Sequence, residues 1–170
     1  MPWLRRAHLT RLLTELAPGI LLRLDPGACR LDRRELGRLG EALAARSLIA
    51  CGWRLVGRRL RTPAGELDLL ARRGDQLAVI EVKTGRLPLR PVVLPGAIGF
   101  LPDRRRDPAR SLGESQAVRL HQAAGLLARR HGLACTVLLV EVRLLPGGSH
   151  EISEPRGVPA PGVRTYTEAP

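Results

Sequence analysis

Two β-prone segments lie so close together in the chain that a tight hairpin is the simplest way to connect them. ELDLLARR (66–73) and QLAVIEVKT (76–84) are separated only by a Gly-Asp dipeptide, which is typical of a two-residue hairpin turn. The turn sets the register, because Arg73 then pairs with Gln76 and pairing continues outward one residue at a time. The sequence therefore predicts an antiparallel strand pair whose facing residues can be named.

This register places two acidic residues opposite each other. Asp68 faces Glu81, and Glu66 faces Lys83; because side chains alternate along a strand, all four share one face with Leu70 and Val79. The other face is apolar and belongs to the core. It comprises Leu67, Leu69, Ala71, Ala78, Ile80 and Val82.

Directly opposed like charges destabilise a strand pair, since their Cβ atoms are roughly 5 Å apart. A hard divalent cation between Asp68 and Glu81 removes that cost, because carboxylate oxygens are ligands that Mg²⁺ prefers. The alternative is an exposed hairpin face, with a Glu66–Lys83 salt bridge and both acids in water. Lys83 is the only lysine among 28 basic residues. The compact ammonium of lysine can lose or share a proton, whereas the guanidinium of arginine stays charged, so a lysine at this position suits a catalytic role.

The pattern of an acid followed, about a dozen residues later, by Glu-x-Lys on the next strand resembles the PD-(D/E)xK nucleases, the restriction-endonuclease-like superfamily. The surrounding text resembles the YraN-type endonuclease-like family, with its G-x-x-G-E-x-x-A, basic strand, G-E-I-D-L-I-A and V-E-V-K-T-R motifs. Here these motifs stand at 37–44, 54–61, 65–71 and 80–85. The resemblance is close over 36–85 and looser over 114–145.

The resemblance implies a catalytic set of Glu41, Asp68, Glu81 and Lys83. Mg²⁺ or Mn²⁺ would be held by the three acids and the backbone carbonyl of Val82, and Lys83 would act on the attacking water. Supporting roles beside the acids are expected for Glu66 and Gln116. Three departures concern the nucleic-acid contacts more than the metal: Gly85 replaces the usual Arg, the second helix lacks a K-Q-R-R-like run, and the segment 86–113 is long and proline-rich.

The remaining elements complete an α/β fold, a mixed central sheet flanked by helices in the order α-β-β-β-α-β. Helices are predicted at 33–51, capped by Asp32 and stopped by Gly52, and at 114–131. Further strands are predicted at 53–61 and 134–145. The predicted organisation is an N-terminal extension (1–30), a nuclease-like domain (31–145) with a proline-rich loop (86–113), and a disordered tail (146–170). The extension could also be a peripheral or membrane-surface helix.

A net charge of +12 suits a polyanionic partner, nucleic acid or an anionic membrane surface. Candidate phosphate contacts are Arg58, Arg59, Arg61, Arg104, Arg105 and Arg106. The three cysteines form no C-x-x-C pair, which argues against a disulfide framework or zinc site and favours the cytoplasm. No segment is apolar enough to span a membrane. The oligomeric state stays open, a homodimer included.

Together these features favour a metal-dependent endonuclease that hydrolyses DNA phosphodiesters, with branched repair or recombination intermediates as one substrate class. The alternative is a non-catalytic nucleic-acid-binding or scaffold protein on a nuclease fold, because a fold does not determine an activity. A third interpretation is a partner of membranes through the N-terminal segment. The complete acid–lysine set favours the enzyme, because a binding module needs no buried acids near DNA.

Overall fold

The computed structural model of this chain describes residues 31–87, 89–95, 97–103, 112–145 and 148–161. The predicted N-terminal extension (1–30) and the arginine run 104–106 lie outside these residues. No helix in the described ranges is both long and apolar enough to cross a membrane.

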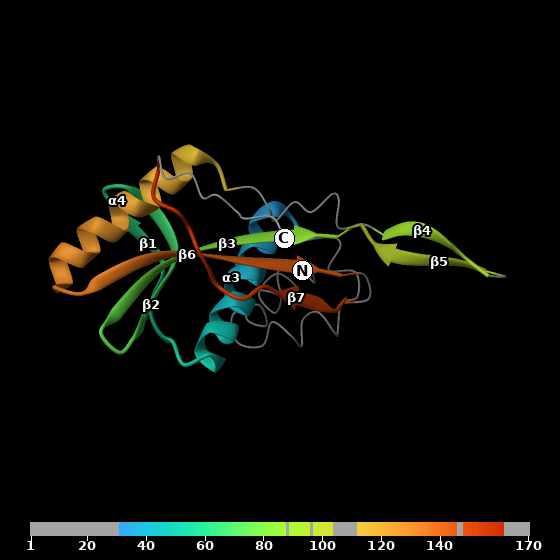
Figure 1. Ribbon diagram of the computed structural model, residues 1–170, viewed down its shortest axis with the longest axis horizontal. Helices are drawn as coiled ribbons and strands as arrows, with labels where there is room; N and C mark the ends of the chain where they lie inside the picture. The colour runs from blue at the N-terminus through green and yellow to red at the C-terminus, as the bar shows by residue number, and fades with distance from the viewer. Residues whose placement is uncertain (1–30, 88, 96, 104–111, 146–147, 162–170) are drawn as a thin grey trace, which may run out of the picture. The chain divides into compact units, whose positions relative to one another are not determined.

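The fold is mixed α/β, with a central sheet and two long helices (Figure 1), as predicted. The sheet order is β1-β2-β3-β6-β7, β8 also pairs with β6, and β4 and β5 form a separate two-stranded sheet. The elements are α3 (Arg33–Ala50), β1 (Arg54–Thr62), β2 (Gly65–Arg73), β3 (Gln76–Arg86), β4 (Leu89–Leu94), β5 (Ala97–Pro102), α4 (Glu114–His131), β6 (Ala134–Leu144), β7 (His150–Ile152) and β8 (Arg156–Gly157).

Two compact units share strands β3 and β6. The α3 unit contains α3 up to Ser47, β3 from Lys83, the β4–β5 hairpin, β6 from Glu141, and β7. The α4 unit contains β1, β2, the first part of β3, α4, the first part of β6, and β8.

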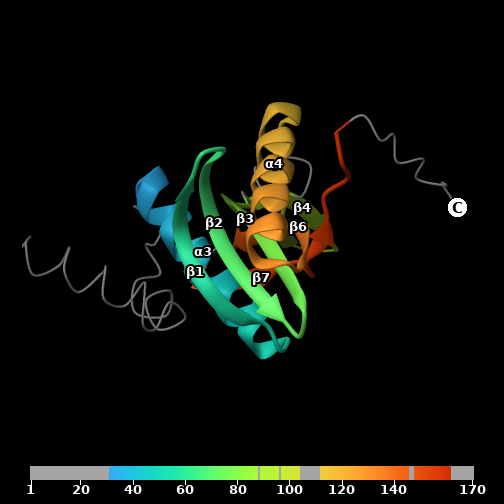
Figure 2. The same cartoon turned by 90° about the vertical axis from the view of Figure 1, so that its left-hand side faces the viewer.

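In the α4 unit, the predicted hairpin register is confirmed from Arg73↔Gln76 to Leu69↔Ile80. Helix α4 covers one face of this unit's strands (Figure 2), burying an apolar cluster that is built from both. Its buried members are Leu67, Leu70, Val79, Leu120, Ala123, Ala124 and Val137. The prediction that Leu67 faces away from Leu70 and Val79 is therefore wrong, and strict alternation along β2 fails between Leu67 and Leu70.

Strands β3 and β6 run in the same direction, which makes the sheet mixed. The Thr136 hydroxyl donates to the carbonyl of Leu77 at 3.4 Å, and the Leu87 N–H donates to the carbonyl of Leu144 at 3.0 Å. From the first contact to the second, the residue number rises on both strands, which is the mark of a parallel pair. The neighbouring strand pairs β1–β2, β2–β3 and β6–β7 are antiparallel.

Helix α3 begins with a reciprocal cap, as the sequence predicts. The Asp32 carboxylate accepts the N–H groups of Arg34 and Glu35 at 2.7 and 2.8 Å. The Glu35 carboxylate accepts the N–H of Asp32 at 2.9 Å. These bonds satisfy backbone donors that no earlier turn can reach. At the other end, Gly52 has φ of 83°, a left-handed conformation that stops the helix.

Within the α3 unit, the helix approaches the end of β3 at a glycine. A methyl group at Gly40 would lie 1.7 Å from Thr84 Oγ1 and 2.7 Å from Thr84 Cβ. Since Cβ cannot rotate away, this close approach requires the absence of a side chain at residue 40. The contact places Glu41, the next residue, beside the segment of β3 that carries Lys83.

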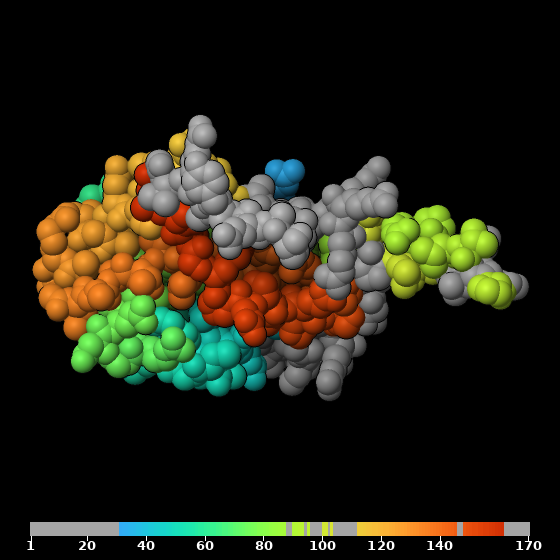
Figure 3. Space-filling view, in the orientation of Figure 1, coloured from blue at the N-terminus to red at the C-terminus, as the bar shows by residue number. Residues whose placement is uncertain are grey.

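Two sequence predictions about irregular segments are wrong. Part of the predicted proline-rich loop forms the antiparallel β4–β5 hairpin, in which Pro91 pairs with Phe100 and Val93 with Ile98. Val93 and Phe100 are 90% and 62% exposed, and the hairpin stands at the molecular surface (Figure 3). Part of the predicted disordered tail pairs with β6 as β7 and β8. Both segments are too short or proline-rich to show strand periodicity.

The close approach at Gly40 can be tested by a pair of alanine substitutions on the same helix. Gly40→Ala is expected to destabilise the protein by about 1–3 kcal/mol, because the methyl group overpacks against Thr84. Gly37→Ala, where nothing lies within 4 Å, is expected to stabilise it by about 0.5–1 kcal/mol. Urea unfolding measures both. An equal rise in the two midpoints would contradict the contact.

Candidate functional site

The β2–β3 ladder ends at Leu69↔Ile80, one residue before Asp68 on β2 and Glu81 on β3, so the predicted Asp68↔Glu81 pair is not part of the observed register. Beyond that point the Asp68 side chain occupies the space between the strands. Its Oδ2 accepts the backbone N–H of Val82 at 2.8 Å. A carboxylate thus takes the place of a ladder carbonyl, and it lies beside the residue that follows Glu81.

An irregularity in β1 accompanies this change. Arg58 pairs with Leu69 and Leu60 with Leu67, so Arg59 stands opposite Asp68 in that register. Arg59 has φ of 49°, a conformation that is uncommon for a residue with a side chain. The β1–β2 register is the same on both sides of Asp68, so the irregularity of β1 at this point lies in the backbone conformation of Arg59.

Glu81 is buried, with only 6% of its surface exposed. Its Oε1 accepts a hydrogen bond from Gln116 Nε2 of α4 at 2.6 Å. A buried carboxylate requires such partners, because loss of water disfavours its charge. The alternative in which both acids project into water is therefore wrong for Glu81. Gln116, expected in a supporting role, does contact the acid.

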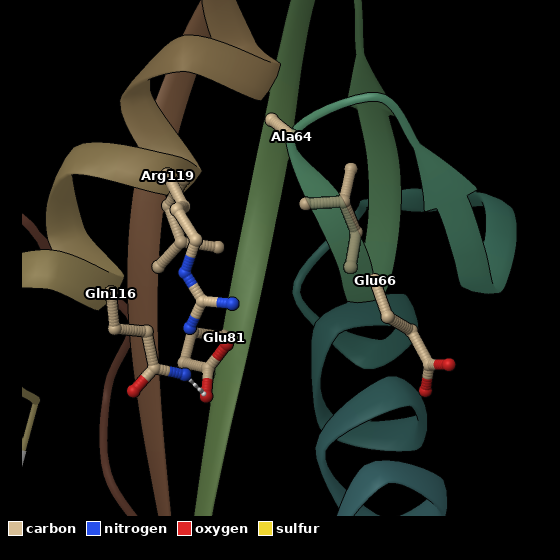
Figure 4. Close-up of a pocket in the computed structure, with 7 residues that line it drawn as sticks. Ala64, Glu66, Glu81, Gln116 and Arg119 are labelled. Atoms are coloured by element: carbon tan, nitrogen blue, oxygen red, sulfur yellow. Dashed lines mark hydrogen bonds between the residues drawn. The ribbon is translucent and has the colours of Figure 1, made fainter.

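Glu66 has a different partner from the predicted one. Its Oε1 pairs with Arg59 Nη2 at 2.9 Å, and both side chains are more than two-fifths exposed. Figure 4 shows the Glu66 carboxylate pointing away from Glu81. The exposed-hairpin alternative paired Glu66 with Lys83, whereas in the structure Glu66 pairs with Arg59.

A cavity of about 20 Å³ lies against Glu81. Gln116, Arg119 and Leu120 of α4 form one wall, and Ala64, Glu66 and Leu67 of β2 and the preceding turn form the other. In Figure 4 the Gln116 and Arg119 side chains reach from α4 toward Glu81. Sequence reasoning did not choose Arg119, although its spacing of three from Gln116 puts both on one helix face.

Glu41 and Lys83 belong to the α3 unit. Glu41 is half-buried and follows Gly40, which lies against Thr84. Lys83 precedes Thr84 and follows Glu81 by two residues on β3. The α3 unit therefore brings the chain segments of Glu41 and Lys83 together, while the α4 unit brings Asp68 to the Glu81–Val82 segment.

Among the other predicted nucleic-acid contacts, Arg58 and Arg61 are exposed on β1. Arg59 is engaged by Glu66. Arg104, Arg105 and Arg106 lie outside the described residues. Arg119, which lines the cavity together with Glu81, comes from a different element, α4.

The donor atoms at Asp68, Glu81 and the Val82 carbonyl are hard oxygens, the type that Mg²⁺ prefers. Within the described ranges, no three His, Cys, Asp or Glu side chains gather closely enough to hold a metal. Mg²⁺ nevertheless commonly uses one or two carboxylates, with waters and substrate phosphates completing its shell. The two acids at the end of the hairpin fit that arrangement.

A larger cleft of about 630 Å³ lies elsewhere in the α4 unit. Trp53, which stacks under the Arg73 guanidinium at 4.5 Å, lines it together with Cys135. Burial raises the pKa of the Cys135 thiol, and its hydrogen bond with the backbone of Val79 offsets part of that rise. The Cys135 thiol is therefore a poor nucleophile at neutral pH, and the cleft contains no acid–lysine set.

Comparison with known proteins identifies one family. The model of "Uncharacterised protein family UPF0102" matches residues 40–142. A UPF0102 protein of Streptomyces griseus is 40% identical over 100 residues, covering 59% of this chain and 71% of the relative. A UPF0102 protein of Chelativorans is 44% identical over 88 residues, covering 49% and 67%.

A UPF0102 protein of Caulobacter vibrioides is 58% identical over 50 residues, covering 29% of this chain and 40% of the relative. The matched part of this chain thus spans two-fifths of that relative's length. The family match runs from the helix that carries Glu41 to the end of β6, so it includes every acid of the candidate site.

The role of Asp68 in joining the strands can be measured separately from any activity. Asp68→Ala is expected to destabilise the protein by about 1–3 kcal/mol, because the N–H of Val82 loses its acceptor in a partly buried place. Glu66→Gln, which weakens only an exposed ion pair, is expected to cost less than about 1 kcal/mol. Chemical denaturation measures both. Equal losses would mean that Asp68 does not hold the strands.

Proposed function

This chain belongs to the family UPF0102, which has a restriction-endonuclease-like nuclease fold, and on that premise we propose that it is a metal-dependent DNA endonuclease. UPF0102 is the YraN family, so the resemblance seen in the sequence is confirmed. The activity, the metal and the DNA substrate are proposals.

The observation that carries the proposal is a buried acid beside a second acid at the open end of a hairpin. Glu81 is 6% exposed, and the Asp68 carboxylate binds the N–H of the residue that follows it. Burying the Glu81 carboxylate costs folding free energy, and an apolar residue at that position would avoid the cost if the hairpin had only a structural role. A site that holds a cation and a phosphate gives the arrangement a use.

In the proposed reaction, a water oxygen bonds to phosphorus, a P–O ester bond breaks, the water gives up a proton and the leaving oxygen gains one. Asp68, Glu81 and the Val82 carbonyl would hold a divalent cation, with Glu41 as the further ligand that the family resemblance implies. When bound, the cation would polarise the phosphate and lower the pKa of water. Lys83 would orient the attacking water and offset negative charge that develops on the phosphoryl oxygens.

The decisive experiment incubates purified protein with linear, nicked, flapped and four-way DNA in Mg²⁺, Mn²⁺ or EDTA. We expect cleavage with the metals and none with EDTA. Asp68→Asn and Lys83→Ala should each reduce the rate at least about 100-fold, because the first removes a charged ligand of the proposed cation and the second removes the group that orients the water and offsets developing charge. Single-turnover rates on labelled DNA measure the effect.

Asp75→Asn is the matched control for Asp68→Asn. Asp75 lies in the turn of the same hairpin, and its side chain is 94% exposed, so its loss should leave the rate unchanged. Lys83→Arg keeps the charge but changes the shape, and should not restore the wild-type rate. Cleavage that survives Asp68→Asn and Lys83→Ala would remove the assignment. DNA binding without cleavage in any metal would support the binding protein instead.

A further inference from the structure

The arginine in the Glu81 cavity differs from the arginines of β1. Arg59 forms an ion pair with Glu66, whereas Arg119 makes no hydrogen bond or ion pair with any residue that the structure describes. It nevertheless lines the same cavity as Glu81, together with the amide that binds that acid. Arg119 and Glu81 therefore line one cavity without forming an ion pair with each other.

The Arg119 guanidinium lies within van der Waals distance of the position that a side chain at Gly65 would occupy. Gly65 has φ of 122°, and a methyl group there would approach Arg119 Nη1 to 3.6 Å. Leu120, the next residue of α4, is 3% exposed and belongs to the apolar cluster. The helix is thus anchored beside Arg119, and the arginine projects from a fixed point toward the cavity (Figure 4).

The size of the cavity restricts what it can hold. A volume of about 20 Å³ accommodates about one water-sized group, which excludes a base or a sugar. A non-bridging phosphate oxygen is of that size, and the guanidinium fork matches phosphate geometry. A phosphate beside Glu81 would meet a like charge, so a positive group there must offset the repulsion.

We infer that Arg119 and Gln116 form a phosphate-oxygen subsite in which the Arg119 guanidinium binds a non-bridging oxygen of the scissile phosphodiester. This inference rests on the proposed function for the identity of the phosphate. It assigns the phosphate contact to the first turns of α4, rather than to the arginines of β1. Arg119 would then be a catalytic residue, because it touches the reacting group.

The test compares Arg119→Gln with Arg129→Gln, an exposed arginine at the other end of the same helix. Arg119→Gln should lower the single-turnover cleavage rate about 100-fold or more, as expected for loss of one donor to developing charge. It should also reduce the slope of log affinity against log salt by about 1, measured with DNA in EDTA. Arg129→Gln should leave the cleavage rate unchanged.

A modified substrate locates the contact. A DNA with a neutral methylphosphonate at the cleaved position should react more slowly with the wild-type protein. It should cause little further loss with Arg119→Gln, because the variant has already lost the same contact. Multiplicative losses would show that Arg119 and the scissile phosphate act independently, and would overturn the subsite. Arg119→Lys keeps the positive charge but removes the guanidinium, so it tests whether the guanidinium geometry is needed. Thermal unfolding of every variant shows whether a lower rate comes from loss of the fold.

The two proposals fail in different ways. If the wild-type protein cleaves DNA and Arg119→Gln matches Arg129→Gln in rate and salt slope, the subsite is wrong and the nuclease stands. If the wild-type protein cleaves nothing, the proposed reaction fails, and the salt slopes in EDTA alone decide the subsite. A salt slope that is reduced in Arg119→Gln but not in Arg129→Gln would then support the subsite, and equal slopes in the two variants would overturn it.

Discussion

The hydrogen bond from the Val82 N–H to the Asp68 carboxylate determines how the candidate site is built. Antiparallel strands normally satisfy their amides with each other's carbonyls. Here a side chain performs that task, so the hairpin can end its ladder at Leu69↔Ile80 without leaving the Val82 donor unpaired. The same bond brings the Asp68 carboxylate to the residue that follows Glu81 on β3.

Burial of Glu81 is the second constraint, and it depends on α4. The helix packs through Leu120, Ala123 and Ala124 against the apolar face of the strands. That packing fixes the position of α4 along the strands, and so places Gln116 within hydrogen-bonding distance of the Glu81 carboxylate. The amide of Gln116 replaces part of the hydration that the buried carboxylate loses. The apolar core supplies the rigidity that keeps the two side chains in contact.

The hairpin register was predictable because a two-residue turn allows only one pairing of the two strands. The observed pairs from Arg73↔Gln76 to Leu69↔Ile80 follow that pairing. The face of Leu67 was not predictable, since alternation along β2 fails between Leu67 and Leu70, a segment that pairs with β1 around the left-handed Arg59. The β4–β5 hairpin escaped prediction because prolines interrupt both strands. Gln116 lies 35 residues from Glu81 in sequence, and only tertiary packing brings them together.

Charge composition alone gives a poor guide to nucleic-acid contacts in this chain. With a net charge of +12, a polyanion is attracted over the whole surface, so arginine-rich segments such as β1 look equally suitable. The structure distinguishes them by their partners. Arg59 is already paired with Glu66, and a new phosphate contact there must first displace that acid. Arg119 requires no such exchange and lies beside a buried carboxylate. Its position in the cavity, rather than its charge, makes it the better candidate for binding the phosphate.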